Sequence, residues 1–354
     1  MDETRKVVET LMRVGPRFTD ISRVSGIPIS TVRYVLLEKL PKLGFHVQIS
    51  VDYAALGLQR YLVEFRSKYP VYQISKILDL LGECTYLDYY VYSMNERRFL
   101  SIFALPPAYE GDFLEFLDLM QASGLIENIK VCKLVYLRAL PLMTDFFNFS
   151  RGVWEQDWFT KLGMREIPES PEHVHSNPKV DKIDLIILSE LQKRVTRIKY
   201  GELAQKFRLT RQTISKHYKH ARNFIKLFAV YWFPPMNPEL IAIPLLIRVP
   251  AESRYRKLLI NIPFTFSEFR SELGEYFAML LVPSMGFYKT LEVLTSNIES
   301  QFLRMDFLDM RYTGKFTIQY HLFQKGLWIN PFETAIEKLV QVVKGSVKQE
   351  KKDK

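Results

Sequence analysis

Cysteine, histidine and long apolar runs are scarce in this sequence. Its 354 residues include only two cysteines, Cys84 and Cys132, and six histidines. Neither cysteine has a CxxC or metal-ligand spacing, which excludes a disulfide framework and a cysteine zinc site, so we expect buried thiols in a reducing compartment. No apolar run approaches the roughly 20 residues that span a bilayer. The first residues form no apolar signal segment, so we expect a cytoplasmic protein with no membrane partner.

The common motifs of catalysis are also absent. The sequence has no GxGxxG fingerprint, no phosphate loop, no nucleophile elbow and no cluster of carboxylates. His173 and His175 form a His-x-His pair without a third ligand nearby, so we expect no metal there. From these absences we expect a chain that is not an enzyme, with no catalytic residues and no cofactor.

Positive charge is present in excess and is unevenly distributed. The net charge is +10, and residues 180–226 hold twelve basic and four acidic residues. The length predicts two to four domains, and 47% hydrophobic with 25% charged residues is a globular composition. A basic segment of this kind suits a polyanionic partner.

Two segments, residues 18–34 and 200–216, share the pattern of a helix-turn-helix. Each has a small residue, Ser22 or Ala204, where two helices would cross closely, then a turn and a second helix that opens on polar and basic side chains. Gly26 occupies the turn position of the first segment and Arg208 that of the second. The repetition about 180 residues apart indicates a tandem duplication.

The second helix of each pattern carries the residues that we expect to bind double-stranded DNA. Arginine pairs with guanine and glutamine with adenine in the major groove, whereas lysines and more distant arginines contact phosphates. The predicted DNA-binding residues are Ser30, Thr31, Arg33 and Tyr34 in the first copy, and Arg211, Gln212, Thr213, Ser215, Lys216, Lys219 and Arg222 in the second.

Each helix-turn-helix is followed by alternating strand and helix patterns. In the first half residues 60–65, 85–92, 99–105 and 128–138 read as strands and residues 71–81 and 112–122 as helices. In the second half segments 241–249, 276–282, 289–294, 298–307 and 316–323 can be laid onto the same order. We therefore expect an α+β fold with two winged helix-turn-helix domains, each followed by a ferredoxin-like βαββαβ module.

The predicted domain order has six parts. They are residues 1–50 and 180–233 (winged helix-turn-helix), 51–140 and 234–330 (ferredoxin-like modules), 141–179 (aromatic segment and Pro-rich linker) and 331–354 (C-terminal helix and charged tail). The aromatic segment includes Phe146, Phe147, Phe149, Trp154, Trp158 and Phe159. Such a density of rings predicts packing at an interface, between the halves or between chains, with base stacking as the alternative.

Residues in both halves resemble the Lrp/AsnC family of prokaryotic transcription regulators, archaeal in type. The resemblance lies in Ile21, Ser22, Val24, Gly26, Ile27, Ser30, Thr31, Val32 and Arg33, in residues 51–57, and in Val180, Asp181, Asp184, Ile187, Leu188, Leu191, Gln192, Glu202, Leu203 and Ala204. It implies a sequence-specific DNA-binding regulator, with a small-molecule effector as an optional partner. It also implies pairing of the modules, as a homo-dimer or an intramolecular pseudo-dimer. Here two units are fused in one chain.

Two other functions are alternatives to that of a DNA-binding regulator. Siroheme decarboxylases share the same two-part architecture and need basic and imidazole groups in the ferredoxin-like modules. The candidates for such imidazoles are His46, expected in the exit strand, and His321, expected in a strand of the second module. A protein-interaction scaffold is the second alternative, and it predicts no selected DNA sequence.

Overall fold

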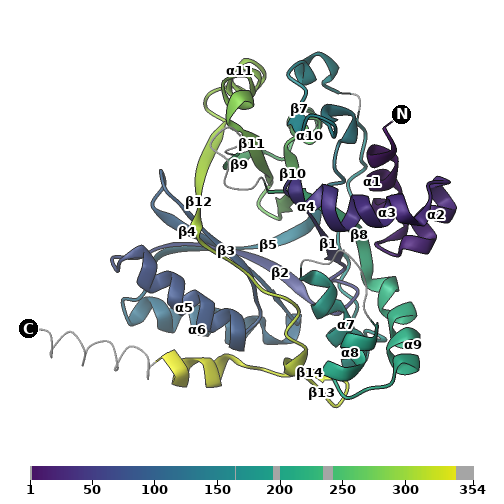
Figure 1. The fold of residues 1–354 in the computed structure, drawn as a ribbon. Helices are drawn as coiled ribbons and strands as arrows, with labels where there is room; N and C mark the ends of the chain where they lie inside the picture. The colour runs from purple at the N-terminus through teal and green to yellow at the C-terminus, as the bar shows by residue number, and fades with distance from the viewer. Residues whose placement is uncertain (1, 164, 194–199, 234–241, 340–354) are drawn as a thin grey trace, which may run out of the picture. The chain divides into compact units, whose positions relative to one another are not determined.

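The computed structural model describes residues 2–163, 165–193, 200–233 and 242–339 (Figure 1). Its contacts divide the chain into two compact units. Unit 1 comprises Met1–Asp52, Leu134–His173 and Ile187–Leu308, and unit 2 comprises Tyr53–Lys133, Val174–Ile186 and Asp309–Lys354. No helix among the described residues is long and apolar enough to cross a membrane.

Both predicted helix-turn-helix segments are helical and contribute to unit 1. The elements are α1 (Glu3–Val14), α2 (Phe18–Ser25), α3 (Ile29–Tyr34), η1 (Val35–Lys39), α4 (Leu40–Lys42), α7 (Lys182–Gln192, which begins in unit 2), α8 (Tyr200–Lys206) and α9 (Arg211–Ala221). Val8, Leu11 and Ile21 are fully buried between the first helices. Gly26 has a φ of 71° and Arg208 a φ of 55°, so both turns use a left-handed residue although only the first has glycine.

The strand that follows each set of helices does not form a wing of its own. β1 (Phe45–Val51) pairs antiparallel with β8 (Ile225–Trp232), from Phe45 opposite Trp232 to Val51 opposite Ile225. The predicted winged domains are therefore wrong, because each exit strand has its partner about 180 residues away and not in a local hairpin. Beside this ladder Gly15, with a φ of 89°, leaves no room for a Cβ because the ring of Phe228 would lie 2.7 Å from it.

Unit 1 also holds a sheet covered by helices. Its elements are β9 (Ala242–Pro250), α10 (Ser253–Ile260), β10 (Thr265–Ser271), β11 (Glu275–Pro283) and α11 (Phe287–Asn297), with parts of β5 (Glu127–Ala139) and β12 (Arg304–Lys315). β11 lies between β9 and β10, and the other edge of β10 pairs with residues 134–139 of β5. Tyr255 and Leu259 of α10 are buried against this sheet.

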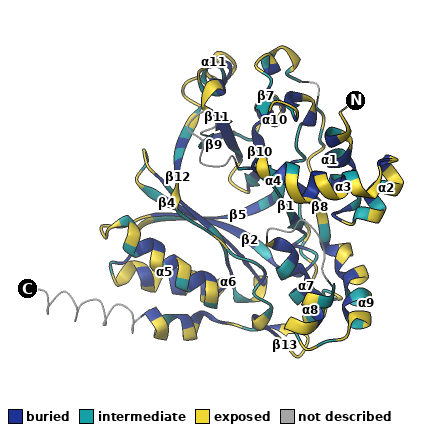
Figure 2. Ribbon diagram, viewed as in Figure 1, coloured by how far each residue is buried: buried dark blue, intermediate teal, exposed yellow. Residues whose placement is uncertain are grey.

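Unit 2 contains the strands of the other sheet region. Its elements are β2 (Gln59–Arg66), α5 (Val71–Cys84), β3 (Leu87–Ser93), β4 (Arg98–Leu105), α6 (Glu110–Ala122), the rest of β5 and β12, β13 (Phe323–Gln324), β14 (Leu327–Trp328) and a helical segment, 332–339. α5 and α6 are buried along one side and exposed along the other (Figure 2). The Phe113 ring of α6 packs 4.9 Å from Phe103 and 5.6 Å from Tyr61.

The prediction of two separate ferredoxin-like modules is also wrong. The strand order is β10-β11-β9-β12-β3-β4-β2-β5, and it closes into one eight-stranded barrel. β5 has 13 residues and β12 has 12, so each is long enough to continue from one unit into the other. Residues 128–138 were predicted as the last strand of one module, but only the first half of β5 pairs with β2, and its second half has β10 as a partner. Strand patterns show which residues share a face, not which strands meet at an edge.

The aromatic segment is part of the core of unit 1. It includes η3 (Thr144–Phe146), β6 (Phe147–Asn148), β7 (Val153–Trp154) and η4 (Trp158–Lys161). The buried Trp154 ring makes edge-on contacts with Phe147, Trp232 and Phe264 at 5.1 to 5.6 Å. Base stacking would need these rings exposed, so the structure favours packing. The six predicted domain boundaries remain a prediction, and the charged tail from residue 340 lies outside the described residues.

Candidate functional site: a buried glutamate held by arginines

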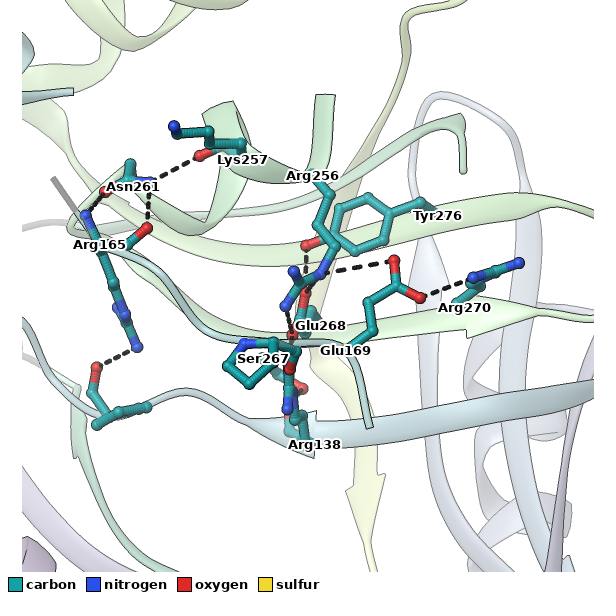
Figure 3. Close-up of polar contacts among 12 residues, drawn as sticks. Arg138, Arg165, Glu169, Arg256, Lys257, Asn261, Ser267, Glu268, Arg270 and Tyr276 are labelled. Atoms are coloured by element: carbon teal, nitrogen blue, oxygen red, sulfur yellow. Dashed lines mark hydrogen bonds and ion pairs between the residues drawn. The ribbon is translucent and has the colours of Figure 1, made fainter. Parts of the chain in front are cut away.

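Glu268 on β10 is a buried carboxylate of unit 1 that accepts four side-chain hydrogen bonds. Its side chain is 0% exposed. Arg138 of β5 donates to it at 2.7 Å, Arg256 of α10 donates twice at 2.9 and 3.0 Å, and Tyr276 of β11 donates at 2.7 Å. Figure 3 shows the three donors converging on Glu268. We call these four residues the Glu268 cluster.

The strand register explains why these side chains meet. Glu268 lies directly opposite Arg138 on β5 and opposite Ala278 on β11. Tyr276 lies two residues from Ala278 on the same face of β11, and its hydroxyl reaches Glu268. Arg256 comes from α10, one residue after Tyr255, whose burial fixes the helix against the sheet.

The charges of the cluster stabilise one another. Burial alone would raise the pKa of Glu268, but hydrogen bonds from Arg256 and Tyr276 and the charge of Arg138 outweigh burial and lower it. Burial opposes the charge of Arg256, yet hydrogen bonding and the charge of Glu268 raise its pKa. Burial and then the charge of Glu268 raise the pKa of Tyr276 well above its ordinary value. At neutral pH the cluster therefore contains an ionised carboxylate, two guanidinium ions and a neutral phenol.

Residues 165–172, which we call the strap, lie over this cluster. The strap was predicted as the start of a Pro-rich linker, but in unit 1 it is hydrogen-bonded along its length. The backbone N–H of Arg165 donates to Asn261 at 2.6 Å, and Asn261 donates back to the Arg165 carbonyl at 3.0 Å. Arg138 donates to the carbonyl of Pro168 at 2.7 Å, and the N–H of Glu172 donates to the carbonyl of Val135 at 2.8 Å.

Two more arginines join the site at the strap. Arg270 pairs with Glu169 at 2.7 Å, and Glu169 is also 4.0 Å from Arg256. Arg165 donates through one nitrogen to the carbonyl of Pro141 at 2.8 Å, while its buried Nη1 has no hydrogen-bond partner among the described residues. Burial lowers the pKa of Arg165 to about 10, so it stays charged at neutral pH.

The site therefore has four arginines and two glutamates. The excess of positive charge and the open donor on Arg165 suit an anionic ligand, and the planar guanidinium group binds carboxylates in particular. Burial and the charge of Glu268 also raise the pKa of Tyr136, which lies opposite Arg270 on β5. Tyr136 and Tyr276 thus remain protonated near neutral pH, and the single hydroxyl hydrogen of Tyr276 is already donated to Glu268.

The residues predicted to bind DNA lie elsewhere in unit 1. Ser30, Arg33, Tyr34, Arg211, Gln212, Lys216, Lys219 and Arg222 are exposed, and Thr31, Thr213 and Ser215 are half-buried. Arg222 donates to the carbonyl of Val14 at 3.1 Å, and Thr213 is tied to the helix cap at Thr210. None of the hydrogen bonds described above for the Glu268 cluster involves them. Their contact with DNA remains a prediction, and we assign them no role in the site.

The sequence analysis missed the residues of this site. β10 was not predicted, because Glu268 puts charge at a position that faces the core and breaks the apolar pattern. A first helix broken at residues 261–263 was expected in the second module, and α10 ends at Ile260. The two aromatic residues of the segment 265–271, Phe266 and Phe269, are the remaining signal of a strand, but their spacing of three does not alternate. His321 was predicted in a strand but lies in η8 (Tyr320–Leu322), and His46 lies in β1 as expected.

Two solved structures match almost the whole chain. One is the siroheme decarboxylase NirDL in complex with an iron-uroporphyrin III analogue, and the other is NirDL without this ligand. Both matches cover 97% of this chain and 100% of the other, with a TM-score of 0.54 and 13% and 14% identity. No family model and no curated protein matches the sequence. At this identity the likeness shows the fold alone.

These matches correct our main expectations from the sequence. The chain was predicted to be an Lrp/AsnC-like transcription regulator, with double-stranded DNA as its partner, and not an enzyme. The fold that it shares over 97% of its length is instead that of the solved siroheme decarboxylase NirDL. The DNA-binding prediction relied on the helix-turn-helix pattern and the basic charge, and such motifs do not define an activity. The family resemblance is therefore withdrawn, and this chain shares the fold of the siroheme decarboxylase NirDL.

Proposed function

We propose that this chain is a decarboxylase that acts on an iron-containing tetrapyrrole with several carboxylate side chains. The arginines around Glu268 and the strap are the observation that carries the proposal. A half-buried group of four arginines with only two carboxylates is suited to recognise a polycarboxylate. The shared fold supports the choice of substrate, because the solved neighbour holds an iron-uroporphyrin III analogue.

The arginines would hold the carboxylates that remain on the substrate. A guanidinium that binds the reacting carboxylate tightly would oppose the loss of its charge, so binding at other carboxylates is what positions the substrate. Arg165 and Arg270 are the candidates because neither belongs to the buried pairs with Glu268.

Decarboxylation also needs a proton donor. Breaking the bond to the carboxylate carbon releases CO2 and leaves an electron pair on the remaining carbon, which must take up a proton. Tyr136 is the candidate in the same region, because a phenol is protonated at neutral pH and the Tyr276 hydroxyl already donates to Glu268. A reducing cytoplasmic location is part of this proposal, and it is consistent with Cys84 and Cys132, which form no disulfide.

Incubation with siroheme and with iron uroporphyrin III under anaerobic, reducing conditions tests the proposal. We expect mass spectrometry to detect products that have lost CO2. Arg165→Gln should slow product formation by about 10- to 100-fold, which corresponds to a lost charged hydrogen bond. Arg254→Gln is the matched control, because Arg254 lies on α10 but pairs with Glu252 and Glu299 outside the site.

The outcome separates the proposal from its alternatives. If both substrates remain intact with folded wild-type protein, the chain is not a decarboxylase of this class. If the two arginine variants lose activity equally, the activity does not depend on the site described above.

A further inference from the structure

The strap carries a carboxylate of its own into the arginine site. We propose that Glu169 is an internal competitor that occupies this site until a substrate carboxylate displaces it, so that the strap acts as an autoinhibitory lid. This inference rests on the proposed function, and it concerns how that same site is regulated. It follows from a contrast between the two glutamates and from the way the strap is anchored.

Glu268 and Glu169 are held very differently. Glu268 is 0% exposed and has three donors, two of them arginines, so it is a permanent part of the fold. The Glu169 side chain is 32% exposed, makes one close ion pair with Arg270, and lies 4.0 Å from Arg256. A partly exposed ion pair contributes little to stability. Glu169 can therefore leave its arginines while Glu268 stays in place.

Both ends of the strap are fixed more firmly than its middle. At one end the backbone of Arg165 makes two hydrogen bonds with Asn261, which is buried. At the other end Glu172 is tied by its backbone to Val135 and by its buried carboxylate to Lys226 at 2.9 Å. The intervening residues are held to the site by Glu169 and by the carbonyl of Pro168. The middle of the strap can rise while both anchors hold.

The displacement of Glu169 favours a ligand that carries a carboxylate. When Glu169 leaves, Arg270 loses its carboxylate partner, and Arg138 loses the Pro168 carbonyl if the backbone rises with it. A substrate carboxylate replaces one anion by another, so the charge of the arginines stays compensated throughout. A neutral ligand offers no such compensation and would leave the guanidinium groups unpaired.

The test compares wild type, Glu169→Gln and Glu166→Gln in titrations with iron uroporphyrin III, followed by the Soret band. Glutamine keeps the size of the side chain and removes its charge. We expect Glu169→Gln to bind about two- to fivefold more tightly, the equivalent of one partly exposed ion pair. Glu166 is the control, because it lies on the same strap but its side chain is 85% exposed. Its ion pair with the exposed Lys257 is long, at 3.9 Å.

Hydrogen exchange supplies a second measurement that needs no ligand. The amides of Glu166, Ile167, Glu169 and Ser170 should exchange faster in Glu169→Gln than in wild type or Glu166→Gln, because the lid opens more often. Unchanged affinity together with unchanged exchange would overturn the lid while leaving the proposed function intact. Weaker binding by Glu169→Gln would also overturn it, because Glu169 would then assist binding. If no variant binds the porphyrin, the proposed function fails, and the lid fails with it.

Discussion

Replacing Glu268 by glutamine is expected to lower the free energy of unfolding by about 3–5 kcal/mol, the range seen when one member of a buried ion pair is removed. Glutamine keeps the shape of the side chain but not its charge. Arg138 and Arg256 would then remain charged beside a neutral amide, in a region where Glu268 has no exposed surface. Urea unfolding followed by circular dichroism measures the effect.

The control for this substitution is Glu252→Gln. Glu252 precedes α10, and its side chain is 47% exposed where it pairs with Arg254. An exposed ion pair contributes little to the free energy of unfolding, so this variant should unfold at a urea concentration close to the wild-type midpoint. Equal midpoints for the two variants would show that the Glu268 cluster is not a structural centre of unit 1.

The same variant should change how stability depends on pH. The pKa of Glu268 is lowered in the folded chain, so its contribution is present above the pKa of the unfolded state and is lost as the pH falls through the folded value. Wild type should therefore lose more stability in acid, below the ordinary glutamate value of 4.5, than Glu268→Gln does. Identical acid profiles for the two proteins would contradict the role of the ionised carboxylate.

The second large effect is expected for Trp154→Ala, at about 3–5 kcal/mol, as for other buried tryptophans. Trp154 is buried, and its ring contacts Phe147, Trp232 and Phe264 within unit 1. Removing the ring leaves a cavity among aromatic neighbours that cannot close without breaking their edge-on contacts. Thermal unfolding measures the loss.

Tyr288→Ala is the control for an exposed ring. Tyr288 lies on α11 and is 79% exposed, so its removal should leave stability nearly unchanged. If Trp154→Ala were as stable as Tyr288→Ala, the aromatic segment would not belong to the core. An interaction surface would then be the better account of its rings.

The parts of the fold that depend on neighbouring residues could be predicted from the sequence. Residues 71–81 and 112–122 have apolar side chains at helical spacing, and they lie in α5 and α6. The turn at Arg208 shows the same point, since the local helix pattern predicted it correctly despite the missing glycine. Local patterns persist because a helix or a turn is set by residues a few positions apart.

The parts that depend on distant residues could not be predicted. The pairing of β1 with β8, and of the second half of β5 with β10, joins strands that no local pattern connects. The site could not be predicted for the same reason, because Glu268 and Arg256 stabilise each other only after the chain has folded. In the sequence each looks like a solvated charge, which is the ordinary state of such residues.

In the proposed function, arginines recognise the carboxylates of a tetrapyrrole. An equilibrium titration of wild-type protein with iron uroporphyrin, iron coproporphyrin and iron protoporphyrin tests it most directly, because these porphyrins carry successively fewer carboxylates. Affinity should fall in that order, and added salt should weaken the binding of uroporphyrin most. Equal affinity for all three, or tightest binding of iron protoporphyrin, would contradict it and indicate apolar recognition of the ring.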